Sequence, residues 1–203
     1  HLEYILKNNI KILSLDEVVE KLDRNEKFNE KAIAFSVDDA YSSFYEIAWP
    51  LLRDNNIPVT LFVSTDIIDK KTKGYMTWLE IKQFIDEGGI VGQHTAAHLH
   101  MPLNSVSDIK KDILNSHKSW IKNIGFIPKL FAYPYGETSN EVIGILKEFD
   151  ISHAFGQHSG VVSSFDNRYY LPRFSLNERF GERDRFEFVV NAYSLDVRNF
   201  LPT

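Results

Sequence analysis

Short apolar segments alternate with longer amphipathic segments along most of this chain, and this alternation limits the possible folds more than any other feature. The apolar segments predict strands at residues 32–35, 58–63, 90–94, 130–136, 151–155 and 170–174, the fourth of which runs into a loop. The amphipathic segments predict helices at residues 2–8, 14–22, 44–55, 77–87, 105–123, 138–149 and 184–192, the third of which is interrupted near Pro50. Repeated alternation of this kind is typical of an α/β fold with a mainly parallel sheet.

Side chains capable of chemistry follow several of the predicted strands. They are Asp38, Asp39, His94, His98, Tyr135 and His158. Parallel α/β barrels place their active sites at the carboxyl ends of the strands. A doubly wound sheet also does so, but usually with a glycine-rich phosphate loop, and the sequence contains none. We therefore expect a (β/α) barrel of about seven strands, incomplete or distorted because the chain is short for eight full units.

Length and composition limit the possible classes of protein. A chain of 203 residues is expected to form one catalytic domain spanning residues 1–203, and its opening inside a predicted helix suggests that the N-terminus is truncated. The net charge of -5 argues against a general nucleic-acid partner or an anionic membrane surface. No apolar run approaches the about 18 residues of a transmembrane segment. Cysteine is absent, so any metal must be bound by His, Asp or Glu.

The first predicted strand of this set ends on two adjacent carboxylates, Asp38 and Asp39. Burying uncompensated carboxylates costs several kcal/mol, so a metal, a basic partner or solvent should lie beside them. The alternative is a solvated loop between a strand and a helix, with Ser42 or Ser43 as the N-cap. The histidines later in the chain favour the metal.

His94 and His98 are four residues apart, after another predicted strand. If the chain turns helically there, both imidazoles lie on one face and can reach the same ion. Two imidazoles and one carboxylate suit Zn²⁺ and leave a position open for water, and Co²⁺ or Ni²⁺ can occupy the same ligands. His100 is close enough in the sequence to be an alternative ligand.

Three short motifs give the chain a specific resemblance. Residues 36–40 read Ser-Val-Asp-Asp-Ala, residues 94–98 read His-Thr-Ala-Ala-His, and residues 132–136 read Ala-Tyr-Pro-Tyr-Gly. In this order they resemble the Thr-Phe-Asp-Asp-Gly, His-Ser/Thr-x-x-His and Arg-x-Pro-Tyr-Gly motifs of the polysaccharide deacetylase family, the NodB-homology carbohydrate esterases. The members that modify exopolysaccharides look most similar, because their third motif also lacks the arginine.

The resemblance implies roles for the residues of the first two motifs. Asp39, His94 and His98 would be the ligands of a divalent metal, and Asp38 would be the general base. An acetamide is a poor electrophile, and water at neutral pH is a poor nucleophile. Zinc addresses both difficulties, because it polarises the carbonyl and lowers the pKa of a bound water to about 7.

The third motif would contribute the backbone N–H of Tyr135, which stabilises the developing oxyanion, and Tyr133 and Pro134 would contact the substrate. The resemblance further implies an incomplete barrel and a hydrolase that removes N-acetyl groups from an amino-sugar polymer outside the cytoplasm. The polymer would be an exopolysaccharide, peptidoglycan or a chitin-like chain.

The chain also departs from the family pattern. Ala132 replaces the arginine that orients the base in many relatives, so Asp38 is either tuned differently or held by another cation. The family's Asp-x-x-Asp-Trp and Leu-x-His motifs are not recognisable, which leaves the general acid unassigned. His158 is the best local candidate because Gly156 and Gly160 let its loop turn, and His153 is a weaker one.

Two other functions remain open at this point. An amidase acting on a small acylated or cyclic amide would use the same ligands in a tighter pocket. A degenerate carbohydrate-binding module of a polysaccharide export assembly would lack turnover, although the intact ligands argue against it. A groove lined by aromatic rings favours a polymer, and the candidate rings are Tyr41, Tyr75, Trp78 and Tyr133.

Overall fold

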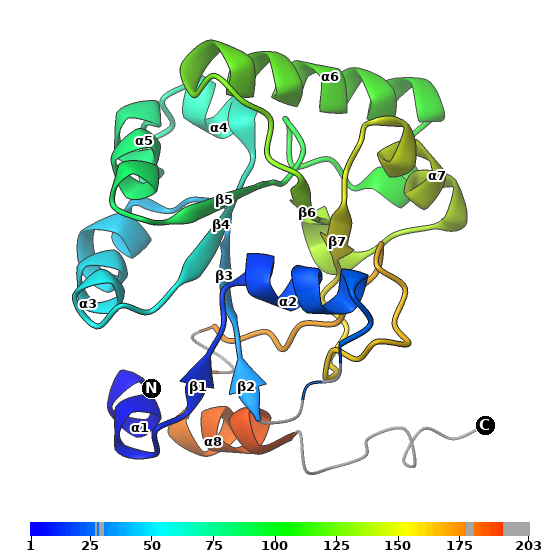
Figure 1. Cartoon of the computed structure of the whole chain (residues 1–203). Helices are drawn as coiled ribbons and strands as arrows, with labels where there is room; N and C mark the ends of the chain where they lie inside the picture. The colour runs from blue at the N-terminus through cyan, green and yellow to red at the C-terminus, as the bar shows by residue number, and fades with distance from the viewer. Residues whose placement is uncertain (27, 29–30, 178–180, 193–203) are drawn as a thin grey trace.

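The computed structural model describes residues 1–26, 28, 31–177 and 181–192, and its central feature is a parallel sheet (Figure 1). The sheet has five strands in sequential order: β3 (Phe35–Asp38), β4 (Val59–Val63), β5 (Ile90–Gln93), β6 (Leu130–Ala132) and β7 (His153–Phe155). All four strand pairs are parallel. The sheet curls into an open half-barrel, so the carboxyl ends of all five strands meet at one rim.

Helices cover the outer face of this sheet (Figure 1). They are α3 (Trp49–Asp54), α4 (Thr65–Asp69), α5 (Trp78–Asp86), α6 (Val106–Asn123) and α7 (Asn140–Glu148). Ile81 and Phe84 of α5 share one buried apolar cluster with β4 and β5, and Ile113 of α6 shares a second with β6 and α7. Among the described residues, no helix is long and apolar enough to cross a membrane.

The concave side of the sheet is filled by aromatic rings. Phe62 of β4 and Phe155 of β7 lie with their centroids 5.8 Å apart. Gly92 of β5 makes room for them, because a Cβ there would lie 2.3 Å from the Phe62 ring. The half-barrel is therefore a packed core that supports the rim and is not an open channel.

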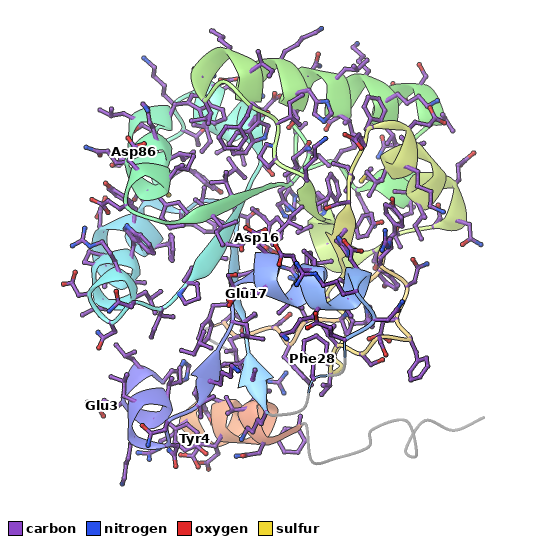
Figure 2. All side chains as sticks on the ribbon, viewed as in Figure 1. Glu3, Tyr4, Asp16, Glu17, Phe28 and Asp86 are labelled. Carbon is purple, nitrogen blue, oxygen red and sulfur yellow. The ribbon has the colours of Figure 1, made fainter. Side chains whose placement is uncertain are left out.

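Helix α2 (Leu15–Asp23) closes part of the same interior with Leu15 and Val19. It begins with a capping box, in which the Ser14 hydroxyl accepts from the Glu17 N–H and the Glu17 carboxylate accepts from the Ser14 N–H. Figure 2 shows Asp16 and Glu17 in its first turn. The helix and cap predicted from residues 14–22 are confirmed.

The first and last described elements pack together beside the half-barrel. Strands β1 (Lys11–Ile12) and β2 (Ala32–Ile33) form a separate parallel pair, flanked by α1 (Leu2–Lys7) and α8 (Arg183–Asn191). Tyr4 of α1, labelled in Figure 2, meets Phe186 of α8 edge-on at 6.0 Å. These two ends of the described chain thus stabilise each other.

The α/β fold and the incomplete barrel are confirmed, with corrections to the strands. The described residues contain seven strands, but five form the half-barrel and two form the separate pair. The strand expected at residues 32–35 is divided at Ala34 between β2 and β3. The helix expected at residues 44–55 contains a π-helical turn at Phe44–Ala48 and continues without a break as α3, so Pro50 stands inside a helical run directly after that turn.

Candidate metal centre

Three predicted ligands converge at the rim of the half-barrel. Asp39 directly follows β3, His94 directly follows β5, and His98 lies in the loop beyond. The Asp39 Oδ1 atom lies 3.6 Å from the His94 Nε2 atom and 3.4 Å from the His98 Nε2 atom. One potential ligand atom from each residue lies within 4.8 Å of the others, so the three can reach one ion.

The environment of these side chains fits a cation. The His94 Nδ1–H donates to the Ala132 carbonyl oxygen at 2.7 Å, which leaves the lone pair of Nε2 directed at the site. Burial lowers the pKa of His94 and so favours the neutral imidazole that binds metals. The Asp39 Oδ1 atom is buried without a hydrogen-bond donor, which is costly unless a cation satisfies it. The donor set of two nitrogens and one oxygen suits Zn²⁺.

The backbone around the ligands is strained. Five residues in or beside the three motifs have positive φ without being glycine: Asp39, Ala40, Thr95, His98 and Tyr135. Each such conformation costs about 1 kcal/mol or more and persists only where the surrounding structure imposes it. The helical turn considered for residues 94–98 does not form, because Ala96 and Ala97 are bends and the other three residues have no regular structure. The two histidines meet through the loop conformation and not through helical spacing.

A buried carboxylate holds this loop in place. Asp112 of α6 accepts from the Ala96 N–H at 2.7 Å and from the Ala97 N–H at 3.0 Å. The Ser64 hydroxyl donates to the His94 carbonyl at 2.8 Å. Sequence reasoning missed Asp112, although an aspartate on the apolar face of a predicted helix is a signal worth following. Asp112 and Ser64 orient the ligand loop through hydrogen bonds to its backbone.

Of the two alternatives for Asp38, the structure shows the one in which another cation holds it, and that cation is Arg173. Its Nη1 and Nη2 atoms lie 2.7 Å and 2.9 Å from the two carboxylate oxygens of Asp38. The Arg173 and Asp38 side chains are only 13% and 19% exposed. Burial alone would raise the pKa of Asp38, but the Arg173 guanidinium, together with His94 and His98, holds the pKa below the ordinary value. Asp38 is therefore an oriented carboxylate at neutral pH.

Arg173 reaches Asp38 across the open edge of the half-barrel. The strand expected at residues 170–174 is wrong as a strand, because only Leu171 forms a bridge there, parallel to Phe155 of β7. Beyond this bridge the Arg173 N–H donates to the His158 carbonyl, and its Nε–H donates to the Gly156 carbonyl at 2.8 Å. The segment thus extends the sheet by one bridge beyond β7 and places the Arg173 guanidinium against Asp38 of β3.

The third motif presents one exposed ring beside the ligands. Tyr135 is 56% exposed, and its ring lies 4.7 Å from the His98 ring and 4.8 Å from the His100 ring, centroid to centroid. Its φ of 61° is followed by a φ of 73° at Gly136, where a Cβ would lie 2.2 Å from the Gln157 Cβ. Glycine is therefore required after Tyr135.

Tyr133 and Pro134 of the same motif are buried. Tyr133 is 1% exposed, and its hydroxyl donates to the Tyr169 carbonyl at 2.7 Å. Pro134 is buried beside it. Contact between these side chains and a substrate, which the resemblance implied, does not fit this burial. Both support the turn that positions Tyr135.

The remaining histidines occupy different environments. The His100 Nε2 atom pairs with the Glu137 carboxylate at 2.8 Å and is not in the ligand cluster. His153 opens β7, at the end of the strand away from the rim, with its Nε2 atom 3.4 Å from the Asp23 carboxylate. It is therefore not placed to act as the acid. His158 is exposed and lies against the Tyr170 ring, 4.3 Å between centroids.

Comparison with known proteins agrees with this fold and with the family resemblance. Residues 25–154 match the family profile described as polysaccharide deacetylase. A poly-beta-1,6-N-acetyl-D-glucosamine N-deacetylase of Staphylococcus aureus is 24% identical over 204 residues, covering 95% of this chain and 68% of the relative. The Staphylococcus epidermidis protein of the same name is also 24% identical, with the same shares.

Solved structures with this fold include two bacterial proteins. The Streptococcus pyogenes deacetylase PplD in complex with acetate has a TM-score of 0.83 and 19% identity, covering 94% of this chain and 84% of that one. IcaB from Ammonifex degensii has a TM-score of 0.81 and 22% identity, with shares of 93% and 84%. The profile match covers most of the chain, including all three motifs. The chain therefore belongs to the polysaccharide deacetylase family.

Proposed function

We propose that this protein is a metal-dependent hydrolase that removes N-acetyl groups from an amino-sugar polysaccharide and releases acetate. The observation that carries the proposal is the convergence of Asp39, His94 and His98 beside an aspartate held by arginine. The carboxylate that follows β3 and the two imidazoles that follow β5 are the ligands, and Asp38 is free of the ligand cluster for proton transfer. We further propose that residues 1–203 act as one catalytic domain.

The ligand set would hold Zn²⁺, or Co²⁺ or Ni²⁺ in its place. When bound, such an ion supplies a Lewis acid that polarises the amide carbonyl and makes water a better nucleophile. Asp38 takes the proton of the attacking water. Its two oxygens accept from Arg173 but keep further lone pairs, so the ion pair orients the base without blocking it.

Tyr135 stabilises the developing oxyanion in this scheme. Its backbone N–H donates to the oxygen on which negative charge develops, where one well-placed donor is worth roughly 3–4 kcal/mol. The left-handed conformation of Tyr135 and the glycine after it support this role, because they turn the backbone sharply next to His98. The exposed ring of Tyr135 lies beside the same position.

An amine leaves only after protonation, and we assign that step to His158. Partial desolvation of the imidazole, whose ring lies against Tyr170, lowers the pKa of His158 below its ordinary value, with Asp166 opposing the effect. The imidazolium is therefore the minor form at neutral pH, and its fraction falls as the pH rises. A rate that depends on it falls on the alkaline side, from a pH below about 6.5.

His158→Ala is expected to lower kcat by about 10²-fold and to remove the alkaline limb of the pH–rate profile. Metal content should not change, because His158 is outside the ligand cluster. The measurement is kcat against pH for both proteins, with metal analysis as the control. Full activity in the variant, with the same profile as the wild type, would mean that water protonates the amine.

The substrate proposal rests on the relatives. The two staphylococcal relatives are poly-beta-1,6-N-acetyl-D-glucosamine N-deacetylases, so we propose a polymer of N-acetylglucosamine, with an exopolysaccharide preferred over peptidoglycan or a chitin-like chain. Such polymers lie outside the cytoplasm, and we place the activity there. The net charge of -5 is compatible with a neutral polymer that becomes cationic as acetyl groups leave.

The direct test is acetate release from defined N-acetylglucosamine oligomers with β-1,6 or β-1,4 linkages. We expect release from the β-1,6 series, with Asp38→Asn protein as the blank. Release from β-1,4 oligomers alone would redirect the proposal to peptidoglycan or chitin-like chains. Release from neither, by protein loaded with zinc, would contradict the deacetylase function.

A further inference from the structure

Two tyrosines form a stacked pair next to the ligand cluster, and nothing in the scheme above uses them. Tyr41 follows the ligand Asp39 by two residues, and its ring stacks on that of Tyr75 with centroids 4.7 Å apart and planes 26° from parallel. Tyr41 is 46% exposed although one face of its ring is covered by Tyr75. The pair therefore offers aromatic surface to solvent beside the site.

The pair is held rigidly with respect to the site. Tyr41 and Tyr75 form an isolated antiparallel bridge. The Met76 N–H donates to the Ala40 carbonyl at 2.8 Å, and the Ser42 N–H donates to the Gly74 carbonyl at 2.9 Å. These bonds clamp the segment before α5 onto the turn after Asp39. A ring that stacks on Tyr41 is consequently placed at a fixed distance from the ligands.

The other candidate rings have structural roles, which makes this pair stand out. Trp78 packs edge-on against the buried Trp120, and its indole N–H donates to Asp69 at 2.8 Å. Tyr133 is buried, as described above. A role in the apolar core does not account for the tyrosine at position 41, because nearly half of the surface of Tyr41 remains exposed to solvent.

We propose that the Tyr41–Tyr75 pair is a platform for the sugar ring next to the unit that is deacetylated. This proposal rests on the proposed function of the site. The apolar C–H face of a hexose packs on an aromatic face, while the tyrosine hydroxyls hydrogen-bond with sugar hydroxyls. A neighbouring ring is present in an oligomer and absent from a single N-acetylglucosamine. The platform therefore makes the protein select chains over monosaccharides.

The test compares the kcat/KM for an N-acetylglucosamine pentamer with that for the monosaccharide. In Tyr41→Ala the ratio of these two values is expected to fall about tenfold, the usual cost of losing one apolar contact. Tyr75→Ala should act in the same direction, because it removes the support of Tyr41. Tyr45→Ala is the matched control, since the Tyr45 hydroxyl donates to Gln83 of α5 on the outer layer. A thermal unfolding curve checks that the Tyr41→Ala protein is folded. An unchanged ratio in the folded variant would overturn the proposal.

A binding measurement separates this proposal from the proposed function. Asp38→Asn protein is titrated with the pentamer by calorimetry, with and without Tyr41→Ala. About tenfold weaker binding in the double variant supports the platform even if the wild type releases no acetate. Equal binding by the two proteins contradicts the platform, whether or not the wild type is active.

Discussion

Asp38→Asn is expected to lower kcat by about 10²–10⁴-fold, the usual contribution of a positioned acid or base. The amide keeps the size of the carboxylate but cannot take a proton from water. Asp39, His94 and His98 are unchanged, so the protein should bind its metal as the wild type does. The measurements are kcat on an N-acetylglucosamine oligomer and metal content on the same preparation.

Asp39→Asn is the matched control for this variant. It changes the neighbouring carboxylate, whose Oδ1 atom faces both histidines, and should weaken metal binding. Loss of metal in Asp38→Asn and its retention in Asp39→Asn would reverse the roles of the two aspartates. Unchanged turnover in Asp38→Asn would exclude it as the base.

Arg173→Ala is expected to reduce both turnover and stability. Removing the arginine leaves the Asp38 carboxylate largely buried without its partner, which costs about 3 kcal/mol of the free energy of unfolding. A displaced base also lowers kcat, by about 10²-fold for a shift near 1 Å. Chemical denaturation and steady-state kinetics measure the two effects separately.

Two further variants serve as controls for Arg173→Ala. Arg173→Lys keeps the positive charge but loses the bidentate geometry, so it should lie between the wild type and Arg173→Ala. Arg168→Ala removes another arginine of the same segment, which pairs with Asp23 at the surface, and should cost less than about 1 kcal/mol. Wild-type kcat in Arg173→Ala would show that the base needs no arginine.

Local patterns in the sequence predicted most of the elements. The strand β4 is buried along its whole length, so its five apolar or β-branched residues carry a clear signal. Helix starts were visible where the cap uses neighbouring residues, as at Ser14 for α2. Short elements such as β1, with two residues, leave too little pattern to detect.

The ligand residues were predicted, but the reason given for two of them was incorrect. His94 and His98 meet because the loop between them takes up strained φ angles and is held by Asp112. Helical spacing has no part in it. Asp112 stands on the apolar face of a predicted helix, which marks it as unusual, but only the folded structure shows that its carboxylate accepts from the ligand loop.

Arg173 could not be found from local pattern at all. It lies 135 residues from Asp38 in the chain, and its segment does not form a regular strand. The motif comparison did indicate that a cation was missing, because Ala132 stands where many relatives have arginine. The position of the replacement follows from the open edge of the half-barrel, which the segment beside β7 fills.

The most direct test of the account is the zinc stoichiometry of chelator-treated protein, measured by calorimetric titration. Wild-type protein is expected to bind one zinc ion per chain and to recover acetate release in the same proportion. His94→Ala should bind none, because it removes the buried ligand whose tautomer is fixed by Ala132. His100→Ala should bind as the wild type does, because His100 is outside the cluster. Zinc binding that survives in His94→Ala, or is absent from the wild type, would contradict the metal centre.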